Sequence, residues 1–337
     1  MVLICPRLHL FEINDQPWFP QYLRLKVQSC LTLCWTFRVP IIQPSSPAQL
    51  VAKTLSRVLS NNVTSYTYVD FCAGAGGPTP YIEVYMNAHL NTSSTSNTTN
   101  ASTSSIANHE VSYAEVAATP KPQIDGLALR SPRPVNGDDR NGKVQFVLTD
   151  LHPHIPDWTE ASKRSENLNF ISESVDAANA PRDLLKNING EANGVHGETK
   201  VFRLYNLAFH HFGDELGGDI LKNTVETADG FGIFELQERT ISSLITMFAM
   251  GIMILGITPF YFWRSPGHLF FTYIIPIIPF VLVFDGIISS VRTRSAGEVE
   301  ALMKKSGGDT SGWKVLSGRE RHTWPTGYMT WVMGVKE

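Results

Sequence analysis

The chain has 337 residues, of which 43% are hydrophobic and 18% are charged, fewer charges than the roughly 25% of an average soluble domain. Lys and Arg total 28 against 31 Asp and Glu, and the formal charge of −3 gives no electrostatic reason to bind nucleic acid. Four cysteines in a chain of this length do not make a disulfide framework, which indicates a reducing compartment. The length suits two domains, or one large domain with additions.

The first 60 residues predict helices. Residues 46–49 (SPAQ) have the pattern of a capping box with proline at the first helical position, and apolar residues then recur at helical spacing as far as Leu59. An earlier apolar stretch, from about Pro20 to Phe37, is long enough for another helix. We therefore predict a helical N-terminal segment over residues 1–60.

From residue 61 on, short strands are predicted to alternate with helices. Tyr66–Phe71 is rich in β-forming residues, ends in a glycine cluster and is followed by a helical pattern over residues 81–90. Four more strands are predicted at 144–148, 168–171, 201–207 and 230–236. This alternation predicts an α/β domain with a doubly wound parallel sheet over residues 61–239.

Two polar stretches interrupt this domain. Fourteen of the 15 residues at 91–105 are Asn, Ser or Thr, and the region as far as residue 140 has few large apolar side chains. A shorter polar stretch covers residues 186–200. Neither stretch can bury enough apolar surface to offset the entropy lost on ordering, so we predict disordered surface insertions at 91–140 and 186–200.

The turn after the first strand carries the pattern that points to a ligand. Residues 72–77 (CAGAGG) let the backbone approach a nucleotide-like molecule closely, because glycine has no Cβ and tolerates positive φ. Asp70 precedes this turn, and Asp150 follows the second strand. A dinucleotide site reserves the helix N-terminus for a pyrophosphate, whereas an acid ahead of the turn suits a ligand with an ammonium group and no phosphate. S-adenosylmethionine is such a ligand.

Residues 69–77 (VDFCAGAGG) resemble the first motif of class I S-adenosylmethionine-dependent methyltransferases, with Cys72 where a glycine often stands. The resemblance covers about residues 8–90 and 142–337, and it implies a Rossmann-like methyltransferase sheet. Cys72 belongs to the implied cofactor turn, although a small buried thiol there is interpreted mainly as packing. Four further segments resemble a little-characterised methyltransferase subfamily with an apolar hairpin near its C-terminus: HLFEINDQPWFP, LTDLHPH, LAFHHF and FGIFELQERT.

The same resemblance implies roles for individual residues in binding S-adenosylmethionine. Asp70 and the backbone at Gly74 and Gly76 would hold the methionine moiety. Asp150 would bind the ribose hydroxyls, and Asp176 would bind the adenine amine. An ordinary NAD or flavin turn is the alternative for the glycine pattern.

Two histidines, His210 and His211, follow the fourth strand, where a doubly wound sheet presents residues to its ligand crevice. Methyl transfer requires a general base only when the acceptor must lose a proton, and these histidines are the predicted catalytic residues for that case. The alternative is a histidine that caps the next helix or is hydrogen-bonded in the core. Glu235, at the end of the fifth strand, is either a crevice residue or a partner of Arg239.

Metal and nucleic-acid sites are not predicted. His152, His154, His210 and His211 show no ligand spacing with cysteine, which disfavours a metal. The chain also lacks the Asn-Pro-Pro-aromatic and Pro-Cys elements of the base-modifying enzymes in the methyltransferase superfamily. Lipids, small molecules or proteins are therefore the acceptors that we consider.

An apolar hairpin is predicted over residues 240–291. Residues 240–263 contain no charged side chain, and neither do residues 265–284. As helices these stretches would be about 36 Å and 30 Å long, against a hydrocarbon core of about 30 Å, which predicts association with a membrane. Basic residues beyond both ends place the catalytic domain on the cytosolic side, with the turn at Arg264 lumenal or within the bilayer. Two buried or interfacial helices packed on the sheet are the alternative.

The last part of the chain, residues 292–337, predicts a helix at 296–305 and strands at 312–316 and 328–335. This resembles the ending of the methyltransferase fold. We therefore predict an S-adenosylmethionine-dependent methyltransferase that acts at a membrane surface on a small-molecule or lipid-like acceptor. A catalytically silent Rossmann-like membrane adaptor and an NAD-dependent oxidoreductase are the alternative functions.

Overall fold

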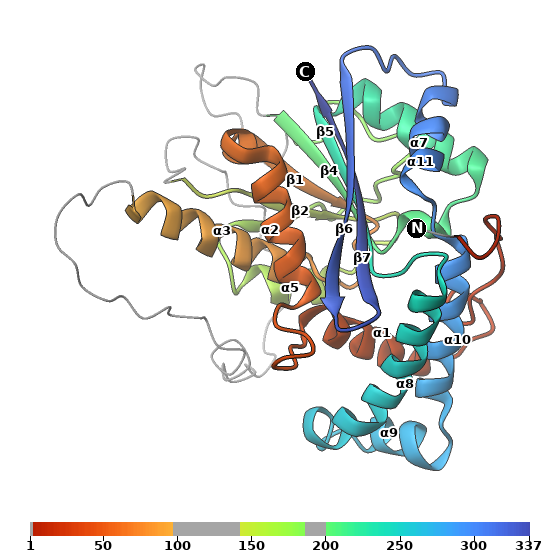
Figure 1. Ribbon diagram of the computed structural model, residues 1–337. Helices are drawn as coiled ribbons and strands as arrows, with labels where there is room; N and C mark the ends of the chain where they lie inside the picture. The colour runs from red at the N-terminus through yellow and green to blue at the C-terminus, as the bar shows by residue number, and fades with distance from the viewer. Residues whose placement is uncertain (1–2, 97–141, 186–199) are drawn as a thin grey trace.

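A seven-stranded sheet forms the centre of the protein (Figure 1). The computed structural model describes residues 3–96, 142–185 and 200–337. The strand order is β3-β2-β1-β4-β5-β7-β6, with β1 to β5 parallel and β7 antiparallel to both of its neighbours. The strands are β1 (Tyr66–Phe71), β2 (Phe146–Thr149), β3 (Leu168–Phe170), β4 (Lys200–Asn206), β5 (Gly230–Glu235), β6 (Trp313–Thr323) and β7 (Gly327–Lys336).

This order confirms the doubly wound fold predicted from the sequence. The chain moves outward from β1 through β2 to β3, and then returns to the other side of β1 for β4 and β5. The order reverses between β1 and β4, and ligands of open α/β sheets bind beyond the carboxyl ends of the strands at such a switch point. A helix at Ala296–Lys305 follows, and the antiparallel pair β6–β7 then completes the sheet, as the methyltransferase resemblance implies.

Helices cover both faces of the sheet (Figure 1). Successive side chains of a strand point to opposite faces, so Tyr68 of β1 belongs to one core and Val69 to the other. On the Tyr68 face lie α2 (Pro47–Leu59), α3 (Thr79–Ser96) and α5 (Ile155–Ser162), and on the Val69 face lie α7 (Asp214–Thr227) and α11 (Ala296–Lys305).

The predicted helix starts are found in the structure. Ser46 Oγ accepts a hydrogen bond from Gln49 N, and Gln49 Oε1 accepts one from Ser46 N, which is the capping box expected for α2.

Residues 91–96 belong to α3, so the start of the predicted 91–140 insertion is helical. Lys200, the last residue of the second predicted insertion, begins β4. The rest of that insertion, and residues 97–140 of the first, lie outside the described residues.

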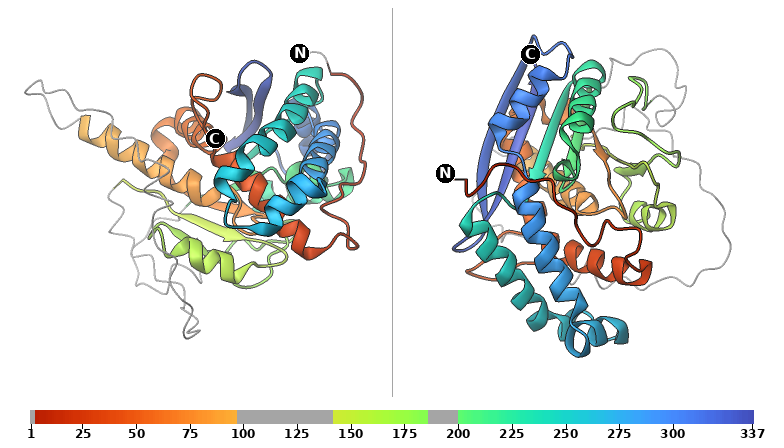
Figure 2. Two further views of the ribbon diagram at one scale, coloured as in Figure 1. Left: turned by 90° about the horizontal axis from the view of Figure 1, so that it is seen from below. Right: turned by 90° about the vertical axis from the view of Figure 1, so that its right-hand side faces the viewer.

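The apolar hairpin projects from one end of the sheet and packs along α1 (Gln21–Thr36) (Figure 2). Val27 and Cys30 of α1 share a buried cluster with Ile254 and Leu282 of the hairpin. The N-terminal segment runs beside it, and Leu8 N donates a hydrogen bond to Val291 O over 3.0 Å. The hairpin consists of α8 (Ile241–Tyr261), α9 (Pro266–Leu269), a π-helical turn η3 (Phe270–Ile274) and α10 (Ile277–Arg292).

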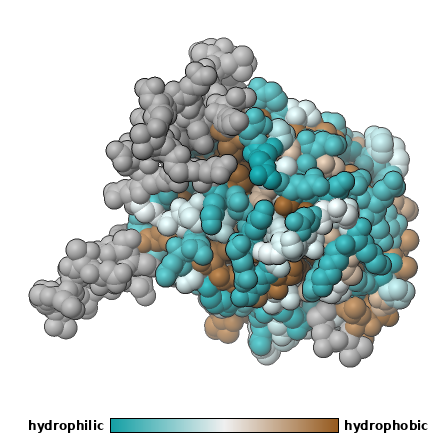
Figure 3. Space-filling view, turned by 90° about the horizontal axis from the view of Figure 1, so that it is seen from above, coloured by the Kyte–Doolittle hydropathy of each residue, from teal (hydrophilic) through white to brown (hydrophobic). Residues whose placement is uncertain are grey.

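Only α8, among the described residues, is long and apolar enough by itself to cross a membrane. The second predicted apolar helix is broken, because the α9–η3 segment meets α10 at an angle of 73°. A proline, Pro276, stands at that break and removes a backbone donor from the helix. Figure 3 shows the molecule from above relative to Figure 1, on the side away from the hairpin. The visible surface of the described residues there is mainly hydrophilic.

Candidate cofactor and acceptor site

Strands β1 and β4, which flank the switch point, are each followed by a residue in the left-handed backbone region. Cys72 has a φ of 65° and Leu207 a φ of 53°, although neither is glycine. Such a conformation costs on the order of 1–3 kcal/mol and persists where the surrounding structure fixes it. The φ of Cys72 also explains why a glycine often stands at this point in sequences that this turn resembles.

Asp70 lies buried between the end of β1 and the start of α3. Thr79 Oγ1 donates a hydrogen bond to Asp70 Oδ2, and Asn206 Nδ2, at the end of β4, donates to Thr79 Oγ1 over 3.0 Å. The second carboxylate oxygen, Asp70 Oδ1, is buried and has no hydrogen-bond partner among the described residues. A buried acceptor without a donor is costly, so Oδ1 marks a place where a ligand donor would be favourable.

The protonation of Asp70 depends on this burial. Removal from water raises the pKa of the Asp70 carboxyl to about 7, while the neighbouring Thr79 hydroxyl and Asn206 amide act in the opposite direction. The charge of Asp150 adds to the rise. Near neutral pH the carboxyl is therefore divided between neutral and ionised forms, and a cationic group beside it would favour the ionised form.

The glycine turn is held in place from β2 and α5. Gly74 has a φ of 53° and Gly76 a φ of 104°, which L side chains rarely adopt. Gly74 N donates a hydrogen bond to Asp150 Oδ2 over 2.8 Å, and Trp158 Nε1 donates to Gly74 O over 2.7 Å. Apart from Gly74 itself and its two chain neighbours, no described residue has an atom within 4 Å of a Cβ placed on Gly74, so the space beside this residue is open.

Asp150 and Asp176, the other predicted cofactor residues, lie on neighbouring loops. Val175 N donates a hydrogen bond to Asp150 O over 2.9 Å, which joins the two loops. Each carboxylate oxygen of Asp150 accepts one backbone N–H, and each oxygen keeps a second acceptor position. Asp176 is exposed, and its Oδ2 accepts a hydrogen bond from Asn179 Nδ2 over 2.7 Å. Both aspartates can accept hydroxyl or amine donors from a ligand.

Cys72 lies in the same turn and is only partly accessible. Burial raises the pKa of its thiol, and the charges of Asp150 and Asp70 act in the same direction. The thiol is therefore protonated at neutral pH. This supports the interpretation of Cys72 as a packing residue within the turn.

His210 is the buried middle residue of a 3₁₀ turn, η2 (Phe209–His211), that follows β4. Its Nδ1 lies 2.8 Å from Glu235 Oε2, and its backbone N donates a hydrogen bond to Glu235 Oε1 over 3.1 Å. A pair between Glu235 and Arg239 was one of the two roles that the sequence suggested for Glu235. That suggestion is wrong, because Arg239 pairs with Glu298 instead. Glu235 fixes the orientation of the His210 ring.

His211 is partly exposed, and its Nδ1 lies 2.9 Å from Asp15 Oδ2. Burial acts to lower the pKa of His211, but the hydrogen bond with Asp15 and the charge of Glu12 outweigh it and raise the pKa. The same hydrogen bond lowers the pKa of Asp15, although burial of that carboxyl acts in the opposite direction. His211 therefore holds a proton more readily than an unperturbed histidine does.

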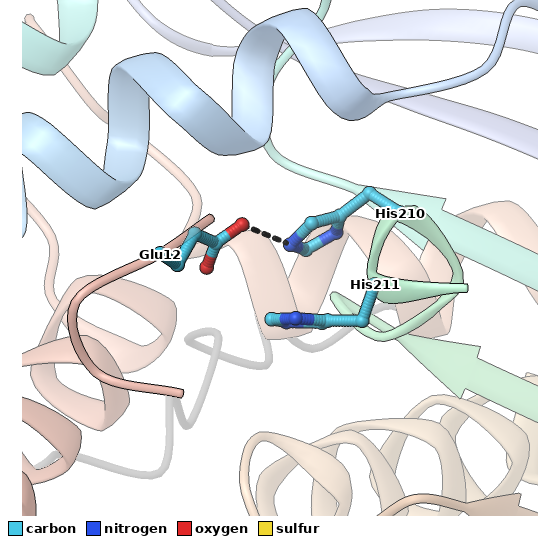
Figure 4. Close-up of side chains that lie close together, drawn as sticks. All are labelled: Glu12, His210 and His211. Carbon is cyan, nitrogen blue, oxygen red and sulfur yellow. Dashed lines mark ion pairs between the residues drawn. The ribbon is translucent and has the colours of Figure 1, made fainter. Parts of the chain in front are cut away.

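Glu12 completes this corner of the molecule and was not among the site residues predicted from the sequence. Its Oε1 accepts hydrogen bonds from Ser289 Oγ over 3.0 Å and from Arg292 Nη1 over 3.2 Å, and it lies 3.6 Å from His210 Nε2 (Figure 4). Arg292 also donates to the backbone oxygens of His210 and His211. The only local signal was the resemblance of HLFEINDQPWFP to a methyltransferase subfamily, since Glu12 and the histidines are far apart in the chain.

One cavity lies beside the glycine turn and another beside Glu235. Neither of these two cavities is lined by Asp70, Asp150 or Asp176. One, of about 250 Å³, lies between α3 and α5, and Ala75 and Gly77 form part of its wall. The other, of about 210 Å³, lies between β5, β7 and α11, and it is lined by residues that include Glu235. The predicted cofactor aspartates thus lie outside both cavities, at the carboxyl ends of the strands.

The chain is similar in overall course to solved methyltransferase structures. The plantazolicin methyltransferase BpumL, in complex with SAH, has a TM-score of 0.45 and 10% identity, with 96% of this chain and 95% of that chain covered. Magnesium protoporphyrin IX methyltransferase (ChlM) from Synechocystis PCC 6803, with bound SAM, has a TM-score of 0.37 and 7% identity, with 96% and 88% covered. No family model and no curated protein matches the sequence. Similarity at this level does not assign an activity to this chain.

Proposed function

We propose that the protein is an S-adenosylmethionine-dependent methyltransferase with a small-molecule or lipid-like acceptor. The observation that carries the proposal is the turn between β1 and α3, where two glycines have positive φ and a buried carboxylate oxygen of Asp70 finds no donor in the described part of the chain. A ligand ammonium supplies that donor, and Gly74 leaves open space for the ligand to approach. The residues present therefore fit S-adenosylmethionine.

Each predicted cofactor residue has a task in this proposal. Asp70 binds the ammonium of the methionine moiety, with Gly74 and Gly76 keeping the backbone clear of side chains. Asp150 accepts the ribose hydroxyls and Asp176 accepts the adenine amine. S-adenosylmethionine, when bound, supplies an activated methyl group, so the protein contributes mainly by holding the acceptor in line and excluding water.

His210 and His211 form the acceptor side of the proposed site. Asn206 of β4 contacts Thr79, and four residues later the same chain segment reaches His210, which joins the two sides. Each imidazole has its Nδ1 beside a carboxylate, and Nε2 is the nitrogen available to take a proton from an acceptor. His211 is the more accessible of the two.

Binding of S-adenosylmethionine to the purified full-length protein tests this proposal. We expect saturable binding by calorimetry, competition by S-adenosylhomocysteine, and loss of binding in Asp70→Ala. Asp219→Ala, which changes an exposed carboxylate on α7, is the control and should bind like the wild type. A folded wild-type protein that does not bind S-adenosylmethionine would indicate a silent adaptor, and a nicotinamide-dependent fluorescence change would indicate an oxidoreductase.

We further propose that the hairpin binds a membrane surface. Ile241, Ile245, Phe248 and Ile252 of α8 are between 52% and 70% exposed, and their spacing puts them on one face of the helix. Met247, Gly251 and Ile254 belong to the face of α8 that is buried. An exposed apolar stripe of this length is typical of helices that contact lipid.

The contacts of the hairpin turn favour a position in the membrane interface over a crossing. Lys26 Nζ of α1 lies 3.5 Å from Ser265 Oγ in the turn, and a Cβ on Gly267 would touch the Tyr22 hydroxyl. A crossing would carry Lys26 to the far side of the bilayer or into it, at high cost. An interfacial hairpin keeps Lys26 at the headgroups and the sheet in the cytosol.

Vesicle co-sedimentation tests the membrane proposal. The double variant Ile245→Ser and Ile252→Ser should lose most binding, whereas Leu216→Ser, an exposed change on α7, should not. Ser265→Cys and Ser311→Cys distinguish the two topologies when labelled with a membrane-impermeant thiol reagent, with the wild type as background. Labelling at both positions fits the interface, and protection of position 265 alone would show that the hairpin crosses.

A further inference from the structure

Three side chains from distant parts of the chain meet beside the carboxyl end of β4. Glu12 comes from the N-terminal segment, and His210 and His211 come from η2. One ligand atom from each lies within 4.8 Å of the other two, and Figure 4 shows both imidazole rings extending toward the Glu12 carboxylate. Metal–nitrogen and metal–oxygen bonds of about 2.0–2.2 Å place the ligand atoms of one ion up to about 4.3 Å apart, so small side-chain rotations suffice.

The hydrogen bonds of the two histidines leave the same nitrogen free on each ring. His210 Nδ1 lies 2.8 Å from Glu235 Oε2, and His211 Nδ1 lies 2.9 Å from Asp15 Oδ2. A carboxylate beside Nδ1 fixes the tautomer with its proton on Nδ1, so the lone pair is on Nε2. Histidines that bind metals are usually oriented by a carboxylate or carbonyl in this way.

The charge around the three side chains also suits a cation. Among the described residues, two further carboxylates, those of Asp15 and Glu235, contact these side chains. In the same part of the chain, a single guanidinium, that of Arg292, is paired with Glu12. Glu12, Asp15 and Glu235 thus bring three carboxylates to a place where Glu12, His210 and Glu235 are buried. Arg292 and Ser289 both hold Glu12 Oε1, which orients the carboxylate toward the histidines.

We propose that Glu12, His210 and His211 bind a divalent transition-metal ion through a carboxylate oxygen and the two Nε2 atoms. Two imidazoles and one carboxylate suit Mn²⁺, Fe²⁺, Co²⁺ or Zn²⁺, whereas Mg²⁺ and Ca²⁺ prefer oxygen ligands alone. The sequence disfavoured a metal because histidine and cysteine spacing was the criterion, and that criterion leaves Glu12 out.

Metal binding and proton uptake use the same Nε2 atoms, so an ion would take the place of the general base in the proposed methyl transfer. The inference itself does not depend on that reaction, because it is tested by measuring bound metal. A protein that binds metal but no S-adenosylmethionine would keep this inference and overturn the proposed function.

The test is equilibrium dialysis of the chelator-treated full-length protein against Mn²⁺, Co²⁺, Zn²⁺ and Mg²⁺, with elemental analysis of the bound ion. We expect one equivalent of a transition metal, no stoichiometric Mg²⁺, and a visible absorption band with Co²⁺. His211→Ala should weaken binding at least about tenfold, and Glu235→Gln, which acts only through His210, by about 10–100-fold. His152→Ala, an exposed histidine elsewhere, is the control and should bind like the wild type.

The melting temperature of each metal-free variant shows whether it folds. The wild type should also melt at a higher temperature with metal, because an ion that binds only the folded state stabilises it. Absence of stoichiometric metal in the wild type, or unchanged metal binding in folded His211→Ala, would overturn the inference and leave the cluster as a structural ion pair.

Discussion

The glycine-turn side and the histidine side of the proposed site are built in different ways. On the turn side, Asp70 and Gly74 lie within five residues of each other, and backbone hydrogen bonds hold the loop. On the histidine side, Glu12, Glu235 and Arg292 come from three distant segments, and side chains hold one another. The turn therefore depends on backbone conformation. The cluster of Glu12, His210 and His211, called the histidine corner below, depends on the packing of the N-terminal segment and α10.

Removing Arg292 should break the histidine corner and leave the turn intact. Arg292 is buried and holds Glu12 together with two backbone carbonyls, so Arg292→Met should lower the free energy of unfolding by about 3 kcal/mol. Affinity for S-adenosylmethionine should stay within about twofold. Chemical denaturation and calorimetry measure the two quantities. Arg57→Met, in an exposed pair with Glu320, is the control and should cost under about 1 kcal/mol. Equal losses in both variants would contradict the comparison.

Substituting Gly74 should do the reverse. A β-branched side chain at a φ of 53° is strained by on the order of 1–3 kcal/mol, so Gly74→Val should distort the turn and weaken S-adenosylmethionine binding about 100-fold. Gly213→Ser is the matched control, because Gly213 caps α7 on the histidine side with a φ of −62° and open space around its Cβ position. Similar affinities of Gly74→Val and Gly213→Ser would show that the ligand does not use the turn.

Trp158 offers a milder test of the turn. Its indole N–H donates to Gly74 O, and its ring is buried against Phe170. Trp158→Phe removes that hydrogen bond and part of the ring, which should cost about 2 kcal/mol of unfolding free energy. Binding of S-adenosylmethionine should weaken severalfold, while metal binding at the histidine corner should not change. A change in the metal affinity would show that the two sides are coupled.

The smallest expected effect is the pH dependence of cofactor binding. Burial raises the pKa of Asp70 to about 7, so the free protein is mostly protonated there at pH 6 and half ionised at pH 7. Because an ammonium binds the ionised carboxylate, affinity for S-adenosylmethionine should rise about fivefold from pH 6 to pH 7. Calorimetry across this range measures the slope. Asp70→Asn should bind weakly with no such slope, and an equal slope in that variant would place the titrating group elsewhere.

The sequence was sufficient to predict the five parallel strands and the glycine turn that follows β1. The spacing of apolar residues and the glycine cluster predicted β1 from Tyr66 to Phe71, and the structure has the same bounds. The capping residues of α2 were also predicted, because such patterns depend on neighbours in the chain. The antiparallel pair β6–β7 was predicted shorter than it is. Strand β6 continues to Thr323 through a charged stretch whose residues have low β propensity.

Only the tertiary structure showed that Glu12 lies beside the histidines and which face of α8 is exposed. It also showed that Glu235 pairs with His210, whereas Arg239 pairs with Glu298. Residue types and spacing determine local backbone, because turns, caps and strand alternation are settled by adjacent residues. Contacts between distant segments depend on how the N-terminal segment, α10 and the end of β4 pack. No local pattern records that packing, which is why the sequence singled out His210 and His211 but not their contacts with Glu12 and Arg292.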